Sequence, residues 1–114
     1  MAKILKLLRG DIAWANLDPT RGHEQSGLRP VLIISQDVFN ERSGTVIAVA
    51  ITSKQPRVGF PLVLELTSVK MPKRSWVKIS QVRMLSTERI SKVIDRASAE
   101  EIARVVEGLN EIVG

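Results

Sequence analysis

The sequence predicts a mainly β protein: a small antiparallel barrel or curled sheet that carries one packed helix. Three observations favour this class. Short runs of β-branched and aliphatic residues recur along the chain, short loops with Gly or Pro separate them, and one segment at the C-terminal end has helical periodicity. With 114 residues, the chain is expected to form a single domain, residues 1–114.

The first two strands are expected on either side of a long loop. Residues 12–17 are rich in apolar side chains and end at the turn-forming pair Asp18-Pro19. Residues 30–35 form a continuous aliphatic run, which is typical of a strand buried on both faces. This second strand should therefore form the centre of the fold.

Further elements follow in order, making about five strands in all. They are a short helical turn over residues 36–43 before Gly44, and strands over 45–52, 60–66 and 75–82, with 83–86 as a possible extension of the last strand. The C-terminal helix begins at a capping box, in which Ser98 precedes Glu101 by three residues. Apolar residues then recur at helical spacing: Ile102, Val105, Val106, Leu109, Ile112 and Val113.

Charge and composition narrow the class of partner. Lys and Arg total 17 against 12 Asp and Glu, a formal net charge of +5 with a pI of about 10.1, which favours a polyanion such as nucleic acid. The absence of cysteine excludes disulfides and thiolate chemistry, and a single histidine argues against a zinc site. Residues 1–8 are too short for a signal peptide or a membrane span, so a cytoplasmic protein is expected.

One loop, Thr20–Pro30, gathers most of the chemically useful side chains. Gly22 and Gly27 permit positive φ angles, while Pro30 biases Arg29 toward an extended conformation at the edge of the next strand. A loop of this kind on a rigid scaffold suggests a binding or catalytic site.

Several residues are candidates for chemistry, each with a simpler alternative. Glu24 could act as a general base or merely be solvated, and His23 could transfer protons near neutral pH or only form hydrogen bonds. Arg29 offers a planar fork for a phosphate, or an ion pair with Glu24 or Asp18. Thr52 could hydrogen-bond a substrate or simply favour the strand.

Two other kinds of site find less support. Asp11, Asp18 and Glu65 share no element, so the spacing does not predict a magnesium site, and the loop glycines do not form a Walker motif. Trp14 and Trp76 could stack on bases, but tryptophans in strands are more often part of the core, which is the interpretation favoured here.

Several sequence blocks in the same order resemble the MazF/PemK/Kid family of toxins. They are Arg9–Ile12, Asp18–Pro30, Ile51–Ser53, Phe60-Pro61 and Ser75–Arg83. The resemblance spans nearly the whole chain from Arg9 onward. It implies an SH3-like β-barrel of the CcdB/MazF type with a C-terminal helix, and a homodimer. It also implies an mRNA interferase that cleaves single-stranded RNA at specific sequences without metal or cofactor, arrests growth, and is neutralised by a cognate antitoxin.

The resemblance assigns roles to individual residues. Arg29 and Thr52 take the catalytic positions, and Glu24 matches a loop glutamate implicated in some members. Contacts to the substrate are expected from His23, Gln25, Ser26, Gly27, Ser53, Lys54, Arg57, Lys73, Arg74 and Gln81, with Lys70 on the same basic connector.

This chemistry suits RNA, because the ribose 2′-hydroxyl is a built-in nucleophile, and the expected products carry 2′,3′-cyclic phosphate and 5′-hydroxyl ends. The antitoxin is expected to cover the site with an acidic, initially disordered segment. Two alternatives remain: a CcdB-like toxin that poisons DNA gyrase, and a noncatalytic RNA-binding barrel.

Overall fold

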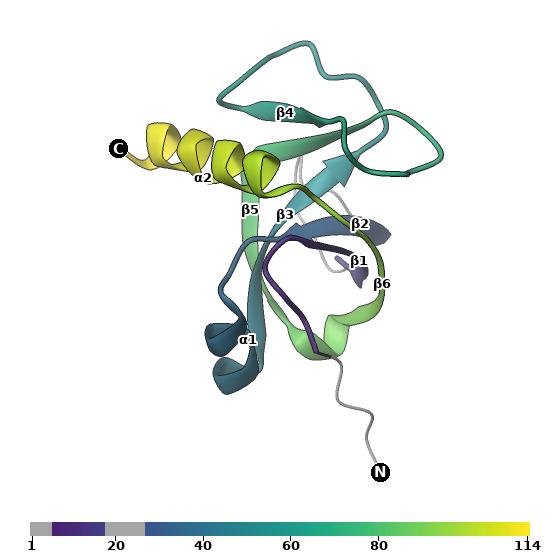
Figure 1. Ribbon diagram of the computed structural model, residues 1–114, viewed down its shortest axis with the longest axis vertical. Helices are drawn as coiled ribbons and strands as arrows, with labels where there is room; N and C mark the ends of the chain where they lie inside the picture. The colour runs from purple at the N-terminus through teal and green to yellow at the C-terminus, as the bar shows by residue number, and fades with distance from the viewer. Residues whose placement is uncertain (1–5, 18–26) are drawn as a thin grey trace.

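The computed structural model describes residues 6–17 and 27–114, which form a curled sheet with helices at its sides (Figure 1). The strands are β1 (Asp11–Asn16), β2 (Leu28–Ile33), β3 (Thr45–Thr52), β4 (Val63–Leu66), β5 (Ser75–Ser86) and β6 (Ile90–Arg96). The helices are α1 (Asp37–Ser43), α2 (Ala99–Val113) and the short 3-10 helix η1 (Thr87–Arg89). The predicted mainly β fold with a C-terminal helix is confirmed.

All these strands belong to one antiparallel sheet in the order β4-β5-β3-β2-β1-β6. β2 lies between β1 and β3, as expected for the central strand. The long strand β5 pairs with β3 along most of its length and holds β4 on its other side. In the part of the chain that the structure describes, β4 and β6 form the two edges of the ladder.

The sheet buries apolar side chains on both faces, and β2 contributes to both. Val31 and Ile33 belong to one cluster with Ala48, whereas Leu32 belongs to the other with Val49. All five side chains have no exposed surface. This alternation explains the continuous apolar run within residues 30–35, because residues 31–35 are buried whichever face of the sheet they point to.

α2 covers one of these faces and is held there by its first turns. The predicted capping box is present: Ser98 Oγ accepts a hydrogen bond from Glu101 N at 3.1 Å, and Glu101 Oε1 accepts one from Ser98 N at 3.0 Å. Ile102 and Val105 are buried in the cluster beneath the helix. The apolar side chains of α2 continue beyond the part of the helix that the sheet covers. The end of α2 projects past β5 and leaves Val113 79% exposed (Figure 1).

The structure differs from the sequence prediction at three strands. β2 covers Leu28–Ile33 rather than residues 30–35. β4 begins at Val63 rather than Phe60, because the preceding residues form a turn in which Leu62 N donates to the Gly59 carbonyl oxygen at 3.0 Å. β6 was not predicted. Its apolar residues do not alternate simply, since the β1–β6 ladder shifts register twice, and Val93 and Ile94 pack against different clusters.

The ends of the strands define two ends of the molecule. α1 follows β2 and precedes β3, so it lies at the end opposite to the one where β2 begins and β3 finishes (Figure 1). Its C-terminal Gly44 has a φ of 68°, the left-handed conformation expected of a glycine at this position. Within residues 6–17 and 27–114, no helix is long and apolar enough to cross a membrane.

Candidate active site

Strand register brings Arg29 and Thr52 together. In the antiparallel pair of β2 and β3, Val31 lies opposite Ala50. Continuing this register by two residues places Arg29 opposite Thr52, where β2 begins and β3 ends. Opposed residues of an antiparallel pair point to the same face, with Cβ atoms roughly 5 Å apart. This extended register, together with the pocket that both residues line, indicates that the two predicted catalytic residues lie close together.

Thr52 has a defined local geometry. Its Oγ1 accepts a hydrogen bond from the backbone N–H of Lys54 at 3.1 Å, which turns the chain as it leaves β3. This bond uses one acceptor lone pair and leaves the hydroxyl hydrogen available for donation. The turn also brings Ser53 and Lys54 to the same end of the sheet. Thr52 can therefore donate a hydrogen bond to a ligand in the space that Lys54 also lines.

A pocket of about 510 Å³ opens at this end of the sheet. It is lined by Trp14, Leu28, Arg29, Pro30, Ile51, Thr52, Ser53, Lys54, Met71, Pro72, Lys73, Ser75 and Ile94. Its volume lies within the range of roughly 300–1,000 Å³ that is typical of ligand sites. Polar and cationic side chains share its wall with apolar ones, a combination that can receive a nucleotide's phosphate and base together.

Among the predicted substrate contacts, Ser53, Lys54 and Lys73 line this pocket together with Arg29 and Thr52. Arg57, Arg74 and Gln81 are outside its lining. These three residues could therefore contact RNA only if the bound RNA extends beyond the pocket.

Arg74 forms an ion pair outside the pocket lining. Its guanidinium donates to both carboxylate oxygens of Glu65, at 2.8 and 3.0 Å, and lies 5.0 Å from the centroid of the Trp76 ring. The hydrogen bond from Arg74, reinforced by its charge, lowers the pKa of Glu65, and Glu65 in turn raises the pKa of Arg74. An RNA phosphate bound at Arg74 would compete with Glu65 for the guanidinium.

The loop singled out in the sequence has its base beside Arg29. Leu17 N donates to the Gly27 carbonyl oxygen at 2.8 Å, and Gly27 has a φ of 76°, as predicted. The two ends of the loop are thus fastened together next to the pocket. The four predicted site residues on the loop lie outside the described residues: His23, Glu24, Gln25 and Ser26.

The two tryptophans differ in their surroundings. Trp76 is 7% exposed, which confirms the prediction that it is covered. Trp14 is only partly buried and lines the pocket, so the core interpretation is wrong for part of its surface. Met71 and Pro72 also line the pocket and were not predicted. The sequence feature that could have indicated them is that they are two apolar residues within the otherwise basic connector of residues 70–74.

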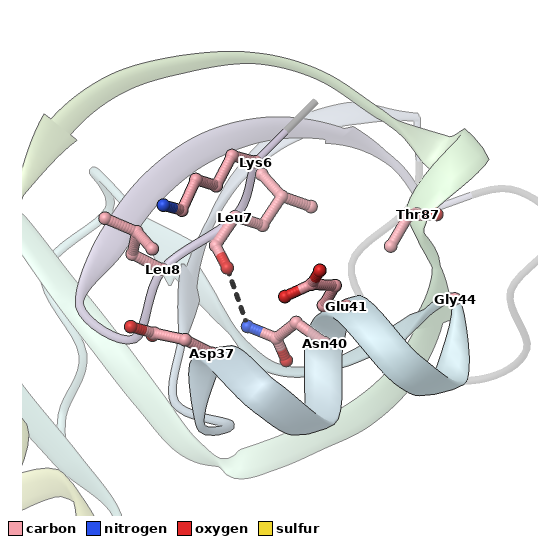
Figure 2. Close-up of a pocket in the computed structure, with 8 residues that line it drawn as sticks. All are labelled: Lys6, Leu7, Leu8, Asp37, Asn40, Glu41, Gly44 and Thr87. Atoms are coloured by element: carbon pink, nitrogen blue, oxygen red, sulfur yellow. Dashed lines mark hydrogen bonds between the residues drawn. The ribbon is translucent and has the colours of Figure 1, made fainter. Parts of the chain in front are cut away.

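A second cavity, of about 320 Å³, lies at the other end of the molecule between α1 and the segment before β1 (Figure 2). Asn40, which is 4% exposed, points to this segment and donates to the Leu7 carbonyl oxygen at 3.0 Å (Figure 2). Glu41 projects into the space beside it. None of the described candidates for chemistry lines this cavity. This hydrogen bond fastens the segment before β1 to α1.

The acidic residues considered as metal ligands are separated and engaged. Asp11 pairs with Arg96 at 2.9 Å, and Glu65 pairs with Arg74 at the far edge of the sheet. Over residues 6–17 and 27–114, no three His, Cys, Asp or Glu side chains group in a way that could hold a metal ion. Asp18 lies outside the described residues.

Comparison with known proteins identifies the family. The family model of the PemK-like, MazF-like toxins of type II toxin-antitoxin systems matches residues 8–113. The chain belongs to this family. Endoribonuclease MazF of Staphylococcus saprophyticus is 33% identical to this PemK/MazF chain over 108 residues, covering 93% of the chain and 90% of that protein. The resemblance drawn from the sequence is confirmed.

Solved structures agree with this membership. MazF from Deinococcus radiodurans superposes on this PemK/MazF toxin with a TM-score of 0.86 at 28% identity, covering 97% of this chain and 99% of that one. An endoribonuclease from mycobacterial species, solved with its cognate antitoxin, has a TM-score of 0.77 at 18% identity and covers 95% of each chain. At that identity the likeness concerns the fold alone.

Proposed function

We propose that this PemK/MazF toxin is an endoribonuclease, an mRNA interferase whose single domain, residues 1–114, cleaves single-stranded RNA in the cytoplasm. One observation carries the proposal: in a chain of this family, Arg29 and Thr52 line one pocket, and the β2–β3 register, continued by two residues, sets them opposite each other. The 33% identity to a protein named endoribonuclease MazF supports the activity.

The reaction needs a proton acceptor and charge stabilisation rather than a metal. The ribose 2′-oxygen attacks the adjacent phosphorus as its proton is removed, the P–O5′ bond breaks, and the 5′-oxygen takes up a proton. The products are a 2′,3′-cyclic phosphate and a 5′-hydroxyl. Arg29 neutralises the charge that builds on the nonbridging oxygens, and Thr52 donates a hydrogen bond to the phosphate. Glu24 positions Arg29 or accepts the 2′ proton.

The surrounding charge suits an RNA backbone. Lys54 and Lys73 line the pocket beside the catalytic pair, and Arg57 is exposed on the loop that follows β3. Cations at these positions attract phosphates and make binding depend on salt. The net charge of +5 acts in the same direction over longer distances.

Two protein partners complete the proposal. A MazE–MazF complex from Deinococcus radiodurans and the mycobacterial complex support a cognate antitoxin for this chain as well. We propose that the antitoxin covers the pocket with an acidic segment, disordered before binding, because such a segment complements the cations there. We propose also that the toxin acts as a homodimer.

The test is cleavage of a long RNA by the purified toxin in excess EDTA, with no gyrase present. We expect fragments with 5′-hydroxyl ends, and sequencing of those ends gives the recognised bases. Failure to cut any long RNA would contradict the proposal. Gyrase poisoning instead would indicate the CcdB-like alternative, and RNA binding without cleavage would indicate a noncatalytic barrel.

A further inference from the structure

The proposed mechanism makes no use of one buried carboxylate, Glu101 in the first turn of α2. It is 8% exposed and accepts four hydrogen bonds. Oε2 accepts from Thr67 N at 2.7 Å and from Ser68 N at 3.2 Å, while Oε1 accepts from Ser98 N at 3.0 Å and from the Ser68 hydroxyl. Every donor is a fixed backbone amide or a hydroxyl.

Only one of these bonds is needed to cap the helix. The Ser98 bond completes the capping box, whereas the other three come from Thr67 and Ser68, more than thirty residues earlier in the chain. Glu101 therefore fastens the segment that follows β4 to the start of α2. A solvated helix cap would not require this second attachment.

A second carboxylate secures the same segment a few residues later. Asp95, on β6, accepts a hydrogen bond from Lys70 N at 2.7 Å. Directly after these two attachments the chain runs through Met71, Pro72 and Lys73, which line the pocket that contains Arg29. Two carboxylates outside the pocket lining thus help to hold this wall, together with the packing of Val69 and Met71 against the core cluster.

We propose that Glu101 is a positioning residue for RNA binding, which holds residues 67–73 so that Met71 to Lys73 form the pocket wall facing the catalytic pair. The inference rests on the proposed function. Glu101 does not touch the reacting atoms, so its loss should weaken substrate binding far more than turnover. Asp95 supports the same wall from β6.

The test measures kcat and KM separately for a short RNA that contains the recognised sequence. Glu101→Gln keeps the shape of the side chain but removes its charge and turns one acceptor into a donor. We expect KM to rise about fivefold or more, with kcat within about twofold of the wild type. Ser68→Ala and Asp95→Asn should raise KM in the same direction by smaller factors, and they decide the question if Glu101→Gln does not fold.

Two controls separate positioning from general stability. Val46→Ala removes buried methyl groups from the cluster on the other face of the sheet, so it lowers the unfolding midpoint without touching this wall. Glu107→Gln removes a charge from an exposed site on the same helix. Both should leave KM unchanged at a temperature where all variants are folded.

The outcomes are distinct. If the wild type cleaves RNA and Glu101→Gln or its substitutes raise KM while the controls do not, the inference stands. If the wild type cleaves and KM rises equally in Val46→Ala, or in none of the variants, Glu101 has only a structural role. If the wild type does not cleave RNA at all, the proposed function itself fails.

Discussion

Glu101 should make the stability of the fold depend on acid pH. Burial raises the pKa of its carboxyl, but hydrogen bonds from Ser68, Ser98 and Thr67 outweigh burial and lower the pKa from 4.5 to about 2. A shift of this size is worth about 3 kcal/mol of folding free energy. Because the folded pKa lies below the unfolded one, this contribution is complete above about pH 4.5 and is lost as the pH falls toward 2.

The Glu101→Gln variant isolates this effect. Urea unfolding at pH 7 and pH 3, at one protein concentration, gives the difference in free energy of unfolding between wild type and variant. The charge-dependent part should fall from about 3 kcal/mol at pH 7 to about 1 kcal/mol at pH 3, whereas the cost of placing an amide there is constant. Glu107→Gln, on the exposed face of α2, should show no such change. A Glu101→Gln difference of equal size at both pH values would refute the reasoning.

Three further predictions concern the fold and the pocket. Gly10→Ala should destabilise by about 2 kcal/mol or more, because Gly10 has a φ of 97° and an added Cβ would lie 2.5 Å from a core methyl group; Gly59→Ala, with open space around it, is the control in the same unfolding experiment. A noncleavable 2′-deoxy analogue of the substrate should quench the fluorescence of Trp76→Phe, whose remaining Trp14 lines the pocket, but not that of Trp14→Phe; the reverse pattern would contradict the placement. Lys54→Ala should make the negative slope of log affinity against log salt concentration less steep by about 1 in a titration with RNA. An unchanged slope would show that this lysine does not contact a phosphate.

Much of the fold follows from local patterns in the sequence. The aliphatic run predicted β2 because a strand buried on both faces needs apolar side chains at successive positions. The capping box predicted the start of α2 because its two side chains satisfy backbone N–H groups within the same few residues. β6 escaped prediction because two register shifts in its pairing with β1 break the alternation that marks a strand. These register shifts arise from the pairing of two strands, so they cannot be predicted from the sequence of β6 alone.

The site shows the same limit. Sequence blocks marked Arg29 and Thr52 as candidates, but only the structure shows that they line one pocket and that the β2–β3 register, continued by two residues, would set them opposite each other. Trp14 was assigned to the core because strand tryptophans usually lie there, whereas its position near the end of β1 leaves part of it in the pocket. The capping role of Glu101 could be predicted from the sequence, but its hydrogen bonds to the segment after β4 could not, since those partners lie more than thirty residues away.

The most direct test of the central claim is a double-mutant cycle on Arg29 and Thr52, the proposed catalytic pair, measured as single-turnover RNA cleavage in EDTA. Arg29→Ala should lower the rate by roughly 100-fold or more without unfolding the protein, and Arg42→Ala, an exposed arginine on α1, is the matched control. Because the proposed mechanism has Arg29 and Thr52 act on one phosphate, adding Thr52→Val to Arg29→Ala should cost much less than Thr52→Val costs alone. Near-normal cleavage by Arg29→Ala, or fully independent effects of the two substitutions, would contradict the account.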